Sequence, residues 1–257
     1  MAKRGRNSFW IFVLVGFGFF AANNFQLPGS GTFGGLGGLL GGPEPVEPDW
    51  AAITAWPGQE AEEVEAQPDP NRTFTAIVLD DSGSMGGDIE PAKAAVLQAL
   101  SSMSEGDRVA VIALNDGVIL PFMSVGDAKS ALPAPLARVT SDGSTPLTAS
   151  IQTARRALAA EAARVGGFGT FRILVTTDGQ ADDGAALRGE IEDLARVTPI
   201  QVATIGVGID DRHVLSRPDL AAFVTVSDIS GLGAALQSAI AEEQNFSAIT
   251  SFEAGGE

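Results

Sequence analysis

The chain has 257 residues, 45% of them hydrophobic, which is enough to bury one sizeable core together with appendages. Its 32 acidic and 16 basic residues give a net charge of −16, and so acidic a folded part would repel nucleic acid and anionic lipid. The absence of cysteine excludes disulfides, thiolate catalysis and Cys-ligated zinc, and we expect the single histidine, His213, in a surface turn.

The N-terminus carries an uncharged apolar run, FWIFVLVGFGFFAA at residues 9–22, behind a basic flank. With its uncharged continuation to Leu27 the run reaches membrane-spanning length, so we expect a single-pass anchor over residues 1–27. The basic flank predicts a cytoplasmic N-terminus, which puts the rest of the chain on the periplasmic or extracellular side of the cell membrane. A cleaved signal peptide and a secreted domain are the alternative, and a buried or partner-bound helix is a third possibility.

A linker is expected over residues 28–71, which are first Gly-rich and then Pro-rich and acidic. Residues 29–34 match the dinucleotide fingerprint G-x-G-x-x-G, but we reject the match because no strand precedes it and no helix follows it. We interpret the Pro-rich part as a flexible tether. The alternative is that its tryptophans, Trp50 and Trp56, dock onto the folded domain or onto a partner.

From residue 72 to residue 243 strand-like and helix-like patterns alternate, before a C-terminal tail at 244–257. The turn Asn115-Asp116-Gly117 indicates a hairpin at a sheet edge. We therefore predict an α/β fold with a doubly wound, mainly parallel sheet, one antiparallel edge strand and helices on both faces. The strands are expected at residues 74–79, 108–114, 118–122, 170–176, 200–207 and 223–226, and the helices at 89–103, 127–139, 146–165, 185–197 and 232–243. Pro133 and Pro135 are expected to break the second of these helices.

Asp80, Ser82 and Ser84 follow the first of these strands at alternate positions. Three oxygen-bearing side chains spaced in this way can converge on one point if the backbone turns tightly, and Gly83 and nearby Gly86 permit such a turn. A doubly wound sheet binds its ligands at the carboxyl ends of the strands, where Asp80 lies. The loop therefore has the outline of a cation site.

The D-x-S-x-S pattern resembles the metal-ion-dependent adhesion site (MIDAS) of von Willebrand factor A (VWA) domains, in its common bacterial form. In that family two further ligands come from separate loops, and both loops have a match here: Thr145 in the sequence DGSTPL and Asp178 in TDG. The resemblance covers residues 72–243 and implies the family's Rossmann-like architecture, which agrees with the fold predicted from the residue pattern.

The resemblance implies how a cation would be held. Ser82, Ser84 and Thr145 would bind it directly, and Asp80 and Asp178 would bind directly or through water. An all-oxygen set of this kind suits Mg²⁺, or Mn²⁺ or Ca²⁺, rather than zinc. A protein partner would then supply a Glu or Asp to the metal, so the family resemblance implies adhesion or assembly and no catalysis. Asp81, which follows Asp80 at the strand exit, is expected to point away from the site.

Other interpretations of these residues remain open. The same residue types are common as turn formers and helix caps. A VWA subunit that couples an AAA+ ATPase of chelatase type to a substrate is a second hypothesis, although an export signal argues against it. A metal-dependent hydrolase is a third. A phosphatase of the haloacid dehalogenase type would need an acid two residues after Asp80, where this chain has Ser82.

Overall fold

The computed structural model describes residues 46–61, 63–209, 213–217 and 220–246. The expected membrane anchor and the Gly-rich part of the linker lie outside these ranges. Within them, no helix is both long enough and apolar enough to cross a bilayer.

A six-stranded sheet of order β3-β2-β1-β4-β5-β6 forms the centre of the domain. Every neighbouring pair is parallel except β2 and β3, which are antiparallel and joined by the predicted hairpin. The central strand β1 is apolar and almost wholly buried, as expected for a strand covered on both faces. The strands are β1 (Thr73–Leu79), β2 (Arg108–Ala113), β3 (Gly117–Ser124), β4 (Thr170–Thr177), β5 (Gln201–Val207) and β6 (Ala222–Val226).

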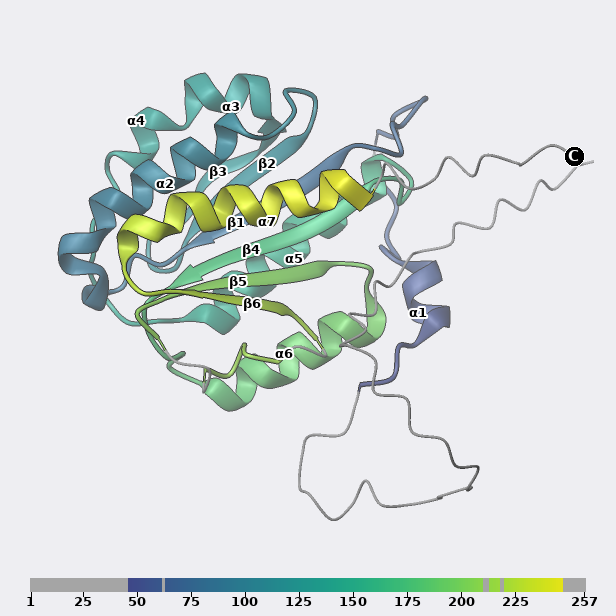
Figure 1. Ribbon diagram of the computed structural model, residues 1–257. Coiled ribbons are helices and arrows are strands. Elements are labelled where there is room, and N and C mark those ends of the chain that lie inside the picture. Colours follow the sequence, from purple (N-terminus) through teal and green to yellow (C-terminus); the bar gives the residue numbers. More distant parts are fainter. Residues whose placement is uncertain (1–45, 62, 210–212, 218–219, 247–257) are drawn as a thin grey trace, which may run out of the picture. The chain divides into compact units, whose positions relative to one another are not determined.

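Helices cover both faces of this sheet, so the predicted α/β architecture is confirmed (Figure 1). One hydrophobic core lies between the sheet and α2, α3, α4 and α7, and a second lies between the sheet and the pair α5 and α6. The helices are α1 (Trp50–Ala55), α2 (Ile89–Ser101), α3 (Val125–Ala131), α4 (Pro133–Leu136), α5 (Leu147–Arg164), α6 (Gly184–Val197) and α7 (Leu232–Phe246), with short 3₁₀ turns η2 (Gly83–Asp88) and η3 (Ile229–Gly231).

The helix expected at residues 127–139 is broken at Pro133, as predicted, into two helices, α3 and α4, which meet at Leu132. The second begins at Pro133, whose ring suits a first helical turn and cannot continue a preceding one. The other expected helices and strands are present with small shifts at their ends.

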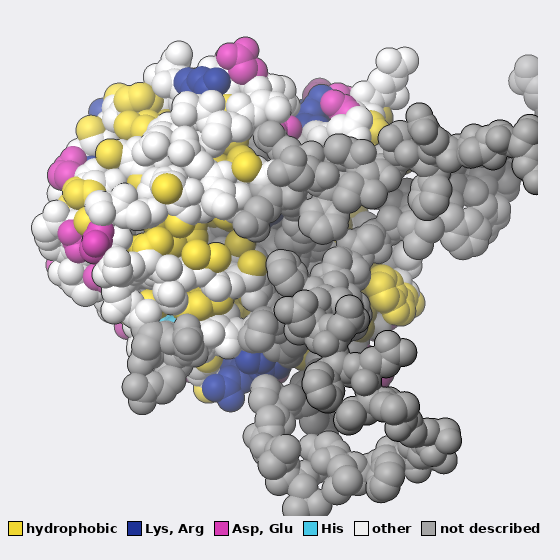
Figure 2. All heavy atoms as spheres, viewed as in Figure 1, with side chains coloured by type: hydrophobic (Ala, Val, Ile, Leu, Met, Phe, Trp, Pro, Cys, Tyr) yellow, Lys and Arg dark blue, Asp and Glu magenta, His cyan; other side chains and the backbone are white. Residues whose placement is uncertain are grey.

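Apolar side chains gather on the surface below α7, over β5 and β6 (Figure 2), where Val224 is 48% exposed.

The interpretation of the Pro-rich segment as a flexible tether is wrong for residues 50–56. Residues 50–55 form α1, and Ile53 within it is only 6% exposed. Trp56 packs edge-on against Phe171 of β4, with ring centroids 4.9 Å apart. The alternative that a tryptophan docks onto the domain is therefore confirmed for Trp56, whereas Trp50 is 54% exposed. Apolar burial and aromatic contact supply the stabilisation that a Pro-rich segment otherwise lacks.

Candidate metal centre

The loops that follow β1 and β4 lie next to each other at the carboxyl edge of the sheet, because these two strands are parallel neighbours. The chain leaves β1 toward β2 on one side and later returns to β4 on the other, which makes this point a topological switch. Open α/β sheets bind ligands at such a switch. Asp80 and Ser82 are buried here, Asp178 is half-buried, and Ser84 is exposed in η2.

Hydrogen bonds join four of the five predicted ligands. Ser84 Oγ donates to Asp178 Oδ1 at 2.7 Å, and the hydroxyl oxygens of Ser82 and Ser84 are 3.0 Å apart. Because the one hydroxyl proton of Ser84 goes to Asp178, Ser82 must be the donor in the bond between the two serines. The Ser82 N–H in turn donates to Asp80 Oδ1 at 2.9 Å. The result is a continuous hydrogen-bonded series of residues from Asp80 to Asp178.

Thr145 lies on a third loop, which backbone hydrogen bonds hold beside the first. Gly143 O accepts from the Gly83 N–H at 3.1 Å. The Thr145 N–H donates to Asp182 Oδ1 at 3.0 Å, and Thr145 O accepts from the Asp182 N–H at 3.1 Å. The Thr145 side chain is half-buried, and no hydrogen bond within the described ranges joins its hydroxyl to the other four residues. The structure thus places the loop of Thr145 at the site without linking its hydroxyl to it.

Asp81 has a role that the sequence pattern did not suggest. Its buried carboxylate accepts from the Asn115 N–H at 2.8 Å, from Asn115 Nδ2 at 3.0 Å and from the Asp116 N–H at 3.1 Å. Asn115 Nδ2 also donates to Ser144 O at 3.0 Å, in the loop of Thr145. Asp81 therefore ties the β2–β3 turn and the Thr145 loop to the end of β1.

Gly143 shows how closely these loops pack. Its φ of +80° lies in the left-handed region, and a Cβ there would come within 2.5 Å of Asn115 Oδ1. A side chain at this position would be strained by its backbone and would also displace Asn115. In the sequence, the only sign of the contact between Asp81 and the Asn115 turn was that each follows one of two neighbouring strands, β1 and β2.

The charges around Asp178 favour an added cation. Burial raises the pKa of its carboxyl group, and the negative charges of Asp80 and Asp88 raise it further, while the hydrogen bond from Ser84 opposes them. The charged groups that shift this pKa are both acidic. A divalent cation would replace this repulsion with attraction, and two carboxylates with three hydroxyls match the oxygen ligands that Mg²⁺ and Ca²⁺ take.

No group of three or more His, Cys, Asp or Glu side chains in the described part of the chain is placed to hold a metal ion. The predicted set does not need such a group, because three of its five members are hydroxyls.

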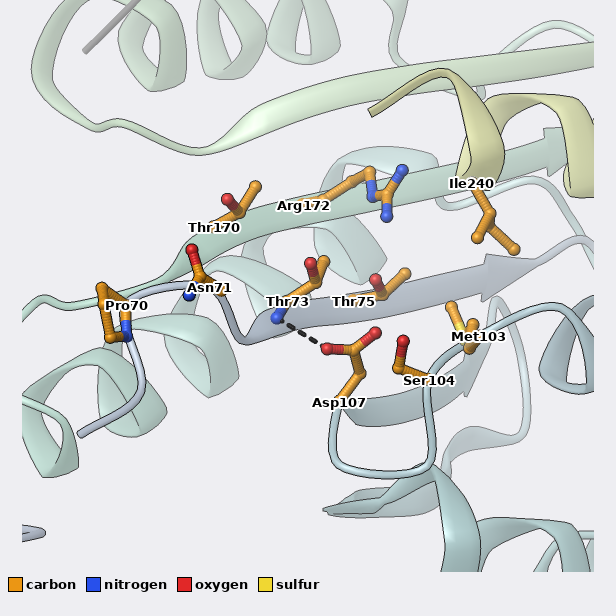
Figure 3. Close-up of a pocket in the computed structure, with 10 residues that line it drawn as sticks. All are labelled: Pro70, Asn71, Thr73, Thr75, Met103, Ser104, Asp107, Thr170, Arg172 and Ile240. Carbon is orange, nitrogen blue, oxygen red and sulfur yellow. Dashed lines mark hydrogen bonds between the residues drawn. The ribbon is translucent and has the colours of Figure 1, made fainter. Parts of the chain in front are cut away.

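A cavity of about 170 Å³ lies at the other edge of the sheet, between the starts of β1 and β4 and the end of α7 (Figure 3). None of the five predicted ligands lines this cavity.

The expectation that His213 lies in a surface turn is wrong. The residue is 3% exposed, and its ring stacks on Phe223 of β6 with centroids 5.7 Å apart. Its Nε2 lies 3.0 Å from Gly179 O, immediately after Asp178. The acidic neighbours in the sequence suggested solvent, but the two ring nitrogens find backbone partners that make burial possible.

Residues 75–180 match the family model described as the von Willebrand factor type A domain. No curated protein matches the chain. Three solved structures share its fold: a von Willebrand factor type A protein from Catenulispora acidiphila (18% identity, TM-score 0.55), the pilus adhesin SpaC from Lactobacillus rhamnosus GG (13%, 0.53) and the vWF domain of the type V pili tip protein Mfa5 from Porphyromonas gingivalis (15%, 0.51).

These matches cover 66%, 71% and 71% of this chain, in the same order. They cover 42%, 31% and 97% of the respective structures, so this chain spans less than half of the first two proteins. At such identities the likeness shows the fold alone. The family match covers residues 75–180, less than half of the chain, and over that part the chain is similar to this family.

Proposed function

We propose that the von Willebrand factor A domain of this chain binds a protein partner through a divalent cation held by Asp80, Ser82, Ser84, Thr145 and Asp178. Domains of this family are generally interaction modules rather than enzymes. The cation would be Mg²⁺, or Mn²⁺ or Ca²⁺, and it would offer an open position to a Glu or Asp of the partner.

The observation that carries this proposal is the group of hydrogen-bonded oxygens that runs from Ser82 through Ser84 to Asp178. It joins residues 94 positions apart in the sequence at the edge of the sheet where this architecture binds ligands. Turn formers and helix caps would bind their own local backbone. The Ser84 hydroxyl instead donates to a carboxylate in the loop after β4, which favours a site over local capping.

In the proposed site, the two aspartates would supply negative charge and the three hydroxyls would be neutral ligands. Asp80 is held by Thr177 Oγ1, which donates to its Oδ2 at 2.7 Å, and by the Ser82 N–H on its Oδ1. Asp178 is half-buried and reaches the surface beside exposed Ser84. Hydroxyl ligands carry no charge, so the bound ion would keep its attraction for a carboxylate from outside.

We also propose that the domain acts outside the cell membrane, tethered by the apolar run at residues 9–22 or released after its cleavage. The run and its basic flank support this topology. The acidic composition of the chain suits a protein partner rather than nucleic acid. The pilus adhesin and the pilus tip protein of the same fold are consistent with a role in adhesion or assembly.

Two measurements test the proposal in sequence. Calorimetric titration of the full chain with Mg²⁺, Mn²⁺ and Ca²⁺ should show binding that Asp178→Ala abolishes. The matched control is Asp116→Ala, which removes an exposed aspartate at the same edge of the sheet. Binding that persists in a folded Asp178→Ala variant would place the cation elsewhere and remove the proposed site.

The second measurement captures partners from the native membrane and exported fractions, with the full chain as bait. A partner held by the wild type in Mg²⁺, and lost both in EDTA and with Asp178→Ala, would support metal-mediated binding. The captured protein should then lose affinity when an acidic residue at its contact surface is neutralised. A partner retained in EDTA would show that the domain binds through another surface.

A further inference from the structure

His213 occupies a position from which it can control the loop of Asp178. It lies between β5 and β6, and its ring is packed flat against Phe223, with an interplanar angle of 15°. Packing on one side and burial on the others fix the ring plane. The two ring nitrogens are then directed at fixed backbone groups, one in its own segment and one in the loop after β4.

The backbone partners determine which ring nitrogen carries the proton. Nδ1 lies 3.1 Å from the Leu215 N–H and must accept, so it is unprotonated. Nε2 therefore carries the proton and donates to the Gly179 carbonyl at 3.0 Å. Burial lowers the pKa of His213 and keeps the ring in this neutral form.

The Gly179 carbonyl depends on this donor. Thr177 Oγ1 also lies 3.2 Å from it, but a hydroxyl has one proton, and the 2.7 Å bond to Asp80 uses that of Thr177. Thr177 Oγ1 instead accepts from the Gly179 N–H at 3.3 Å. His213 is thus the donor that fixes the carbonyl side of the peptide next to Asp178.

We propose that His213 is a positioning residue, which holds the Thr177–Gly179 turn so that Asp178 faces Ser84 and the cation. The inference rests on the proposed function, since it assigns His213 to the support of the same site. Outer residues that orient a metal ligand by hydrogen bonding commonly change metal affinity by about 10-fold or more when they are replaced. His213 would act in this way through the backbone, without touching the metal.

Three substitutions separate the functions of the ring. His213→Gln keeps an N–H donor near the position of Nε2 and can still bond to the Gly179 carbonyl. His213→Asn keeps an acceptor near the position of Nδ1 for the Leu215 N–H, but its side chain is too short to reach Gly179. His213→Phe keeps the ring that stacks on Phe223 and loses both hydrogen bonds.

The experiment measures Mg²⁺ affinity of the full chain by calorimetry, and amide hydrogen exchange of Gly179 without cation. We expect His213→Phe and His213→Asn to bind Mg²⁺ about 10-fold more weakly than the wild type, and His213→Gln to recover most of that loss. Exchange at Gly179 should be faster in the Phe and Asn variants and close to wild type in the Gln variant.

Each outcome decides the inference. Equal Mg²⁺ affinity and equal Gly179 exchange in all four proteins would overturn it, as would a Gln variant no better than Asn. If His213→Phe does not fold, the Gln and Asn pair gives the same decision. If the wild type binds no cation, the proposed function fails, while Gly179 exchange still shows whether His213 holds the turn.

Discussion

At the amino edge of the sheet, where the parallel strands begin, arginines and glutamates neutralise one another. Arg72 pairs with Glu65 at 2.8 Å, and Glu161 lies 2.7 Å from Arg108 and 3.1 Å from Arg164. At the carboxyl edge of the same strands, Asp178 bonds to a serine hydroxyl, and its nearest charges are other aspartates. The same sheet therefore ends in paired charges on one side and in like charges on the other.

Under the proposed function, the amino edge contributes to stability and the carboxyl edge binds the ligand. Paired charges at the amino edge need nothing from outside, and they hold α5 and residues before β1 to the sheet. Like charges at the carboxyl edge raise the free energy of the folded protein, and a bound cation would remove this cost. The nearby imidazole of His213 is neutral and does not offset them. Four predictions test this comparison, beginning with the largest effect.

Glu161→Gln should lower the free energy of unfolding by about 2–3 kcal/mol. Glu161 is buried, and its loss would leave Arg108, which is 21% exposed, without its carboxylate. The exposed fraction of Arg108 puts the expected change below that of a fully buried pair. Urea unfolding of the full chain measures it.

The matched control at the same edge is Glu65→Gln. Its partner Arg72 is also part-exposed, but Glu65 itself is 35% exposed, so solvent screens the pair and the change should be well below that of Glu161→Gln. Equal effects of the two substitutions would mean that burial does not set the strength of these pairs. The ion pairs of the amino edge would then not account for a difference in stability between the two edges.

Asp81→Asn should destabilise the domain by about 1–2 kcal/mol, although it removes a negative charge from the acidic edge. The Asp81 carboxylate accepts three hydrogen bonds from Asn115 and Asp116, and an amide in its place would turn an N–H toward one of those donors. Urea unfolding without cation measures the change. A stabilised variant would show that Asp81 repels its neighbours and does not anchor the β2–β3 turn.

The sequence predicted what depends on local pattern. The apolar run of β1, the Asn115-Asp116-Gly117 hairpin and the D-x-S-x-S loop are each contained in a few consecutive residues, and the fold built from such patterns is confirmed. The order of Thr145 and Asp178 in the sequence suggested them as further ligands of the predicted site. Their geometry could be seen only after the strands were aligned, because β1 and β4 are 90 residues or more apart in the chain.

Contacts between distant residues were the ones that the sequence did not reveal. Trp56 docks because Phe171 and Phe74 stack with centroids 5.0 Å apart and present an aromatic surface at the start of β4. His213 is buried because Gly179 and Leu215 supply backbone partners for both ring nitrogens. In both cases an acidic or Pro-rich neighbourhood indicated solvent, and tertiary contacts overrode it.

The stability of the wild type should fall as the pH is lowered from about 8 to about 5 more steeply than that of His213→Gln. Burial places the folded-state pKa of His213 below its ordinary value of 6.5, so the unfolded chain binds the proton more readily. The contribution of neutral His213 is full above 6.5 and is lost as the pH falls through the folded-state pKa. Glutamine does not titrate, so parallel pH profiles of the two proteins would show that His213 is charged or exposed.

The smallest effect is expected from Asp178→Asn, and it should have the opposite sign to that of Asp81→Asn. Without cation, the substitution should raise the free energy of unfolding, because it removes a charge that burial and Asp80 disfavour. Asp178 is only half-buried, so solvent screening keeps the expected gain to about 0.5 kcal/mol. The Asn oxygen can still accept the proton of Ser84. Urea unfolding in EDTA measures the gain, with Asp116→Asn as the control for net charge.

Addition of Mg²⁺ sharpens this last comparison. The wild type should gain stability from a ligand that binds only the folded state, and Asp178→Asn should not, so the order of the two proteins should reverse. Destabilisation of Asp178→Asn in EDTA would show that the carboxyl edge is held together by its aspartates in the same way as the amino edge is by its ion pairs. Opposite signs for two aspartates at the end of neighbouring strands would instead separate the anchor of the turn from the ligand of the metal.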